Sequence, residues 1–234
     1  MKPLSDEKII DSWKKNARQW GAAVQVGQIE SREVVTNKAI VEAVLSYSPE
    51  AVADIGCGEG WLVRELARRI TQVVGIDAVP GLIDQAKAAG GGDFFVASYE
   101  AIADGAIKGL FDVVVCNFSL LGEESVQALF GAMPSLLKPG GVCIVQTLHP
   151  MVACGDLPYI DGWREGSWAG FGSDFIDPAP WYFRTLENWT SLFSDNGLRL
   201  LEIREPIHPK TQKPASIIFI GATAANNAMH ATSA

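Results

Sequence analysis

The chain has 234 residues, of which 48% are hydrophobic and 20% are charged, and its formal net charge at pH 7 is −8. This length and composition fit a single globular domain with a large core, and no apolar run approaches the roughly 18 residues that span a bilayer. The negative charge gives no electrostatic attraction to nucleic acid, whose phosphates are neutralised by Lys and Arg. The amino terminus lacks the apolar segment of a secretory signal, so we predict a cytoplasmic protein with neither a membrane nor a nucleic-acid partner.

Four scattered cysteines give no metal-binding pattern. None belongs to a C-x-x-C pair or clusters with His149, His208 or His230 in the way that a zinc site requires. We therefore predict no metal and expect reduced thiols at all four positions, which are Cys57, Cys116, Cys143 and Cys154.

Two helices are predicted before the first strand. Residues 5–26 and 31–46 repeat apolar side chains every three or four positions, which marks one face of a helix. Trp13, Trp20 and Arg32 are the side chains there that could face a ligand. We favour core packing for the tryptophans and solvent exposure for the arginine.

The segment Val52–Gly60, with the sequence VADIGCGEG, predicts a buried strand that breaks into a glycine turn and opens a helix over residues 61–70. Gly56, Gly58 and Gly60 lack a Cβ, so the backbone can take positive φ and a ligand can lie almost on the main chain. The first N–H groups of the helix attract a carboxylate or a phosphate. The turn therefore predicts a site for a nucleoside-bearing ligand.

The spacing of the glycines separates two classes of such ligand. A dinucleotide fingerprint is G-x-G-x-x-G, whereas this turn is G-x-G-x-G with Asp54 two residues before the first glycine. The apolar segment 72–77 then ends in Asp77, about 20 residues beyond Gly56, where an acid can accept hydrogen bonds from two ribose hydroxyls. These two blocks resemble motifs I and II of the class I S-adenosylmethionine-dependent methyltransferases of the small-molecule type.

The resemblance implies S-adenosyl-L-methionine as the cofactor and S-adenosyl-L-homocysteine as the product. Ser98 and Tyr99 follow a third strand at the point where the family usually has an acid beside the adenine amine, so Ser98 and the Tyr99 backbone would take that role. Cys57 is expected to be a small residue packed beneath the ligand. The predicted cofactor-binding residues are Asp54, Gly56, Cys57, Gly58, Gly60, Asp77, Ala78, Ser98, Tyr99, Asn117 and Phe118.

The later segments complete a parallel sheet. Residues 110–116 form a near-continuous apolar run, typical of a central strand covered on both faces, and resemble motif IV of the family. Lys-Pro-Gly-Gly at 138–141, before another apolar strand, is a further frequent class I feature. Segments 198–205 and 216–221 predict a terminal hairpin. The predicted fold is α/β, a Rossmann-like doubly wound sheet of seven strands in three layers, mostly parallel with an antiparallel last strand.

We predict one methyltransferase domain over residues 1–221, followed by a disordered tail at 222–234. The resemblance implies that residues 1–48 are helices that cap the ligand pocket. Residues 151–183 thread aromatic and acidic side chains among Gly and Pro, too polar and broken for a regular element. A loop this long is usually a lid or a binding segment, although its aromatics could instead pin an insertion to the core, and both interpretations stay open.

Within that segment, Trp168, Trp181 and Tyr182 are the candidate substrate-binding residues. An amine acceptor would use ring faces together with the acids, whereas an uncharged apolar or phenolic acceptor would use the rings alone. We favour the second, because exposed acids are common on loops.

The predicted reaction is methyl transfer to a small-molecule acceptor, with oxygen, nitrogen and carbon all open as the methylated atom. His149, directly after the fifth strand, is the candidate general base, and the competing interpretation is that it holds the start of a loop by a hydrogen bond. Two other function classes also fit the sequence. They are an NAD(P)-dependent reductase and a non-catalytic nucleoside-binding protein on the same fold.

Overall fold

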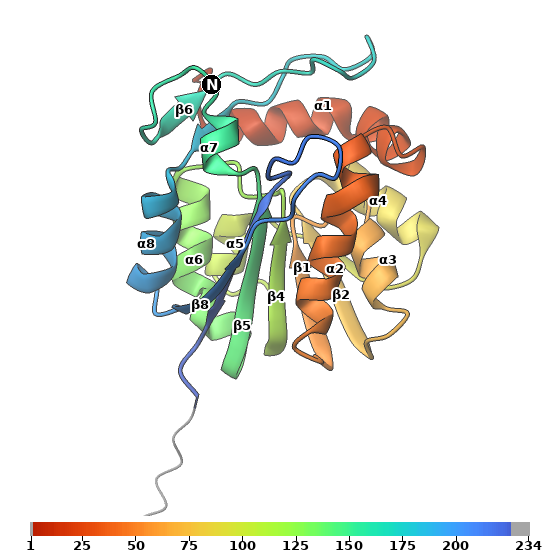
Figure 1. The fold of residues 1–234 in the computed structure, drawn as a ribbon. Coiled ribbons are helices and arrows are strands. Elements are labelled where there is room, and N and C mark those ends of the chain that lie inside the picture. The colour runs from red at the N-terminus through yellow and green to blue at the C-terminus, as the bar shows by residue number, and fades with distance from the viewer. Residues whose placement is uncertain (1, 226–234) are drawn as a thin grey trace, which may run out of the picture.

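The computed structural model describes residues 2–225, and a seven-stranded sheet with the order β3-β2-β1-β4-β5-β9-β8 forms its centre (Figure 1). Strands β1 to β5 are parallel, and β9 is antiparallel to both of its neighbours, β5 and β8. The predicted fold class is therefore confirmed. The strands are β1 (Ala51–Ile55), β2 (Gln72–Asp77), β3 (Asp93–Val96), β4 (Phe111–Asn117), β5 (Leu137–Thr147), β8 (Arg199–Arg204) and β9 (Ile217–Ala222).

Helices cover both faces of this sheet, which makes three layers. One face packs against α2 (Asn37–Leu45), which directly follows η1 (Arg32–Thr36), and against α3 (Trp61–Leu66) and α4 (Pro80–Ala89). The other face packs against α5 (Tyr99–Ala103), α6 (Glu124–Leu136) and α8 (Leu186–Asp195). Since helices bury both sides of β4, its residues 113–116 are wholly apolar and fully buried, as the near-continuous apolar run predicts. Among residues 2–225, no helix is long and apolar enough to cross a membrane.

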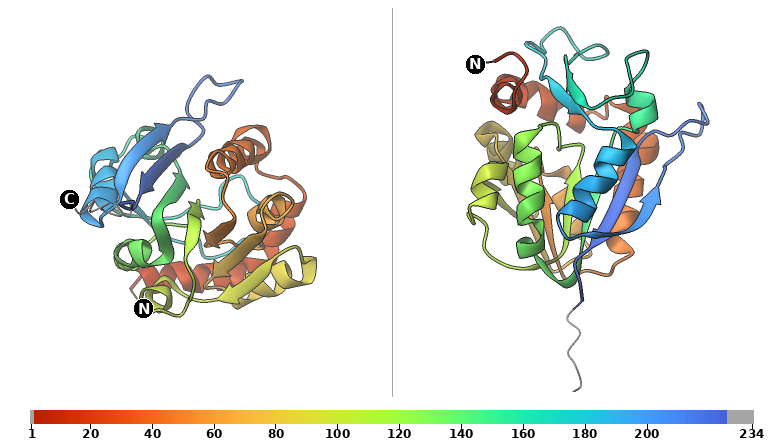
Figure 2. Two further views of the ribbon diagram at one scale, coloured as in Figure 1. Left: turned by 90° about the horizontal axis from the view of Figure 1, so that it is seen from below. Right: turned by 90° about the vertical axis from the view of Figure 1, so that its left-hand side faces the viewer.

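A further layer lies at the carboxyl ends of the parallel strands. Helix α1 (Asp6–Gln25) crosses this end and packs on α4, with Ala17 against Val79 and Leu82. The short helix α7 (Pro150–Ala153) and the rest of segment 151–183 lie at the same end, as Figures 1 and 2 show. The carboxyl ends of the parallel strands are therefore covered by two segments that are far apart in the sequence.

Three predictions about elements need correction. Segment 151–183 is not free of regular structure, because β6 (Gly162–Arg164) and β7 (Trp181–Phe183) pair as a small antiparallel sheet whose centre is the edge-to-face pair of Trp163 and Tyr182. The helix predicted over 31–46 begins with the π-helical turn η1, and the helix after the glycine turn ends at Leu66.

The chain also stays ordered beyond residue 221. Ala222 is the last residue of β9, and the Thr223 N–H donates to the Gly141 carbonyl (3.0 Å), so the tail cannot begin at residue 222. The remainder of that prediction, residues 226–234, lies outside the described part of the chain.

Candidate cofactor and acceptor site

A cavity of about 1660 Å³ opens at the carboxyl ends of β1, β2 and β4, beneath α1. It extends from the glycine turn to the aromatic side chains of segment 151–183. Most of the predicted site residues line it, namely Gly56, Cys57, Gly58, Asp77, Ala78, Ser98, Tyr99, Asn117, Phe118, Trp168, Trp181 and Tyr182. Asp54, Gly60 and His149 do not.

The three glycines of the turn all have positive φ, but each has a different neighbour. A Cβ on Gly58 (φ 58°) would meet only the Trp20 indole nitrogen at 3.7 Å, so this position faces the open cavity. A Cβ on Gly56 would lie 2.2 Å from the Ser119 side chain, and one on Gly60 would lie 2.6 Å from the Phe94 ring. Gly58 therefore leaves room for a ligand, whereas the other two allow close packing of the turn.

Asp77 ties the end of β2 to the glycine turn. Its Oδ2 accepts a hydrogen bond from the Gly58 N–H and its Oδ1 accepts one from the Val79 N–H, both at 2.9 Å. Burial raises the pKa of Asp77 above its ordinary value, and the two backbone N–H groups oppose that rise. Each oxygen keeps a second lone pair, so the carboxylate can still accept hydrogen bonds from hydroxyl groups in the cavity.

Asp54 lies behind the surface of the turn, and Cys57 is a largely buried part of the cavity wall. Asp54 is 1% exposed, and within the described residues its Oδ1 has no hydrogen-bond partner. Burial, reinforced by the charge of Asp77, raises the pKa of Asp54 well above its usual range. Burial likewise raises the pKa of the Cys57 thiol, which keeps it neutral. Any role of Asp54 in cofactor binding would be exerted through the turn, since it does not reach the cavity.

The loops after β3 and β4 are held together. The Ser98 hydroxyl caps α5 by accepting from the Ala101 N–H (3.2 Å), and the Tyr99 hydroxyl donates to the Ser119 carbonyl (2.9 Å). Phe118 has φ 54°, a left-handed backbone that is rare for a bulky residue and is commonest at functional sites. Its N–H donates to the Gln146 carbonyl at 2.8 Å, which fixes this conformation.

Arg32 and Glu59 are charged residues of the cavity wall beside the glycine turn that are absent from the predicted set. Arg32 is only 9% exposed, and its guanidinium lies over the rings of Trp20 (5.8 Å) and Trp61 (5.1 Å), so the expectation of solvent exposure is wrong. Glu59 is 2% exposed and pairs with Arg64 (3.1 Å) through one oxygen, while its other oxygen has no partner in the described chain. Arg32 is one of the side chains that the sequence analysis names as able to face a ligand, and an acid inside the glycine turn is the signal that could have identified Glu59.

The structure does not bring His149 to the cavity. Its Nε2 lies 2.7 Å from Glu205 Oε1, and its neighbours Leu148 and Pro150 line the wall instead. The partner Glu205 follows β8, so this contact directs the His149 ring toward the end of β8. This geometry agrees with the interpretation in which His149 holds the start of the loop.

The β6–β7 sheet is fastened to the loop that follows β4. The Tyr182 N–H donates to the Leu121 carbonyl (2.7 Å), and the Trp163 indole donates to Glu123 Oε2 (2.8 Å). Arg184 donates to the Glu123 carbonyl (3.2 Å). These bonds make β7 one wall of the cavity.

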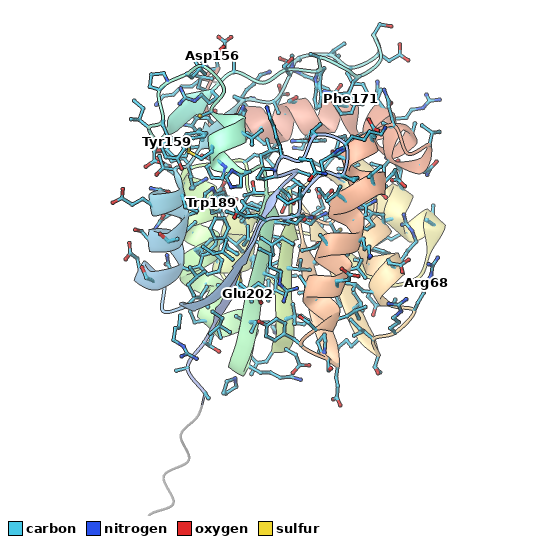
Figure 3. All side chains as sticks on the ribbon, viewed as in Figure 1. Arg68, Asp156, Tyr159, Phe171, Trp189 and Glu202 are labelled. Atoms are coloured by element: carbon cyan, nitrogen blue, oxygen red, sulfur yellow. The ribbon has the colours of Figure 1, made fainter. Side chains whose placement is uncertain are left out.

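Residues 168–177 are fastened to α1 instead. The Asn16 side chain exchanges two hydrogen bonds with the backbone of Ile176, at 2.7 and 2.9 Å, and Asp177 forms ion pairs with Lys8 and Lys15. Trp168 packs edge to face on Trp13 at 5.6 Å. Phe171, labelled above α1 in Figure 3, lies near Trp20 of the same helix, with the ring centroids 6.1 Å apart. We name this unit of α1 and residues 168–177 the α1 cover.

The sheet order, with an antiparallel β9 inserted between β5 and β8, is that of the class I S-adenosylmethionine-dependent methyltransferases. Comparison with known families agrees, because residues 52–141 match the model of a methyltransferase domain. Residues 52–141 therefore form a methyltransferase domain, and the fold of the chain is the one that S-adenosylmethionine-dependent methyltransferases share.

Solved structures share this fold at low identity. A putative S-adenosylmethionine-dependent methyltransferase from Listeria monocytogenes has a TM-score of 0.63 and 19% identity, and the match covers 80% of this chain and 98% of that one. The magnesium protoporphyrin IX methyltransferase of Synechocystis PCC 6803 with bound S-adenosylmethionine also has a TM-score of 0.63, at 16% identity over 96% of this chain and all (100%) of that one.

Two relatives in sequence carry the same name. A ubiquinone biosynthesis O-methyltransferase of Rickettsia canadensis is 25% identical over 213 residues, which cover 86% of this chain and 84% of that protein. A protein of the same name from Xanthomonas oryzae pv. oryzae is 36% identical over 114 residues, and this match spans only 47% of each chain.

Proposed function

We propose that this methyltransferase transfers the methyl group of S-adenosylmethionine to an oxygen atom of a small apolar or phenolic acceptor. The size of the cavity carries the proposal. A pocket for one small molecule usually measures about 300–1,000 Å³, so a volume of about 1660 Å³ accommodates a cofactor and an acceptor together. The relatives named O-methyltransferase support oxygen as the methylated atom.

The charges around the glycine turn suit the parts of the cofactor. Asp77 would accept from the ribose hydroxyls, and Ser98 with the Tyr99 backbone would contact the adenine. Arg32 and Glu59 supply one positive and one negative group for the carboxylate and ammonium of the methionine part. These assignments are part of the proposal, and Gly58 would leave the space in which the cofactor lies.

The sulfonium of the cofactor already activates the methyl group. The protein then has to hold the acceptor in line with the S–CH3 bond and exclude water, and such positioning can contribute about 7–11 kcal/mol at best. The α1 cover and β7 close the cavity above the strand ends and suit this task.

The acids of segment 151–183 do not support a cationic acceptor. None of the five lines the cavity. Asp161 accepts from the Thr185 N–H (2.6 Å), Asp177 pairs with α1, and Asp156 points outward in Figure 3. The rings that do line the cavity favour an apolar or phenolic molecule. The position of the site beneath α1 and the net charge of −8 also favour a small molecule over nucleic acid as the acceptor.

A screen for release of S-adenosylhomocysteine tests this proposal. The acceptor library contains phenols, carboxylic acids and primary amines of similar size, and Gly58→Val is the control variant with a blocked turn. We expect turnover with phenols or acids that disappears in the control. Turnover with amines alone contradicts the proposal. So does the absence of turnover with all three classes in a protein that still binds S-adenosylhomocysteine.

A further inference from the structure

Arg184, the residue after β7, is a buried cation on the acceptor side of the cavity. It is 4% exposed and belongs to the cavity wall. Its guanidinium lies over the rings of Tyr182 (4.9 Å) and Trp189 (5.3 Å). Figure 3 shows Trp189 at the upper end of α8, below β6. Burial lowers the pKa of Arg184 to about 10, so the side chain is still charged at neutral pH.

The guanidinium is only partly satisfied by the protein. Its Nη2 donates to the Glu123 carbonyl at 3.2 Å, but Nη1 has no hydrogen-bond partner among residues 2–225. No carboxylate in that range forms an ion pair with it. Burying a charge without a hydrogen-bonded counter-ion is unfavourable, so such groups usually bind a charge supplied from elsewhere.

Three acids lie close enough for their charge to act on Arg184, but other donors bind each of them. Glu123 accepts from the Trp163 indole (2.8 Å), Asp161 from the Thr185 N–H (2.6 Å), and Asp6 from the N–H groups that begin α6. The neighbouring Tyr182 is a neutral phenol, because burial and the nearby Glu123 raise its pKa. No group of the described protein therefore neutralises the guanidinium by direct contact.

We propose that Arg184 binds an anionic oxygen of the acceptor. This inference rests on the proposed function and narrows the acceptor to an acid. Two sources share this chemistry: a phenol that reacts as its phenolate, or a carboxylate carried beside the methylated atom. For a phenol, the proton leaves to solvent first. A lone pair of the phenolate oxygen then forms the O–CH3 bond as the S–CH3 bond breaks, and that electron pair stays on sulfur.

The test uses the full chain saturated with S-adenosylhomocysteine and 4-nitrophenol as the probe, because its phenolate has a visible absorption band. We expect the bound probe to ionise at a pH at least one unit below that of the free probe, which is a tenfold preference for the anion. Arg184→Met should abolish the shift and Arg184→Lys should restore part of it. Arg164→Met is the matched control, because Arg164 also lies over a ring of this segment (Phe183, 5.1 Å) but is not on the cavity wall.

A second arm separates the two sources. Benzoate and benzamide have nearly the same shape but differ in charge. A carboxylate is identified if wild type binds benzoate at least tenfold more tightly than benzamide, if Arg184→Met loses this preference, and if bound 4-nitrophenol ionises at the same pH as the free probe. The proposal is overturned if wild type that binds S-adenosylhomocysteine prefers neither the phenolate form of 4-nitrophenol nor benzoate. It is also overturned if Arg184→Met binds S-adenosylhomocysteine and keeps both of these preferences. Failure of wild type to bind S-adenosylhomocysteine would instead count against the proposed cofactor site.

Discussion

The Asp77 carboxylate has two roles. It accepts hydrogen bonds from the Gly58 and Val79 N–H groups, and its remaining lone pairs face the cavity. Asp77→Ala removes charge-assisted hydrogen bonds worth about 1.5–3 kcal/mol, so we expect at least tenfold weaker binding of S-adenosylhomocysteine. Calorimetry measures this, with Asp93→Ala at the exposed start of β3 as the control. Equal affinity in wild type and Asp77→Ala would remove Asp77 from the ribose site.

Gly58 is the position at which a side chain would enter the cavity. Gly58→Val should abolish binding of S-adenosylhomocysteine, and the strained positive φ should lower the free energy of unfolding by about 1–3 kcal/mol. Gly105→Val is the matched control, because Gly105 also has positive φ but open space around it. The control should lose similar stability and keep its affinity. Binding by Gly58→Val would mean that the nucleoside lies elsewhere.

At the residue scale, the sequence predicts a site residue when a short stretch of neighbouring residues is enough to specify it. The glycines and Asp77 follow from the spacing of one strand, one turn and the next strand. Arg32 and Arg184 do not, because an arginine acquires its role only when helices and rings from distant segments bury it. His149 stands at the predicted strand end, but the direction of its side chain depends on the partner Glu205, which lies 56 residues away.

At the scale of elements, the α1 cover and β7 are the two parts that close the acceptor side. Trp168 belongs to the first and Trp181 to the second, and both line the cavity. Trp168→Ala and Trp181→Ala should impair turnover or raise the acceptor KM far more than they weaken binding of S-adenosylhomocysteine. Steady-state kinetics on an acceptor found by screening checks this. Normal acceptor kinetics in both variants would show that these rings only pack.

The attachment of residues 168–177 to α1 should depend on pH. Hydrogen bonds from Lys15 and Lys8 lower the pKa of Asp177, so the folded form of this acid binds its proton less readily than the unfolded form. The stabilisation that these ion pairs give the folded state is complete above the pKa of Asp177 in the unfolded chain, about 3.9. It is lost as the pH falls through the lower pKa of Asp177 in the folded chain. We expect limited proteolysis within residues 168–177 to be slow at pH 7 and faster near pH 3, and Asp177→Asn to be cut faster already at pH 7. Equal cleavage of wild type and Asp177→Asn at pH 7 would contradict this attachment.

At the scale of the whole molecule, the parallel sheet is the most predictable feature, because burial on both faces requires the continuous apolar runs seen in β4 and β5. The β6–β7 sheet is the least predictable. Its strands have three residues each and are 16 residues apart in the chain, too short for an alternating pattern to show. They are held by bonds to the loop after β4, and no property of residues 151–183 alone specifies that contact.

Ligand-induced stability tests the cofactor on the intact chain. A ligand that binds only the folded state at 100 times its Kd stabilises that state by about 2.7 kcal/mol. Each kcal/mol shifts the Tm of a domain of this size by about 2–4 °C, so S-adenosylhomocysteine should raise the Tm by roughly 5–10 °C. NAD should give no shift, because the turn has the G-x-G-x-G spacing, and Gly58→Val should respond to neither ligand. If NAD raised the Tm and S-adenosylhomocysteine did not, an NAD(P)-dependent reductase would be the better interpretation of this fold.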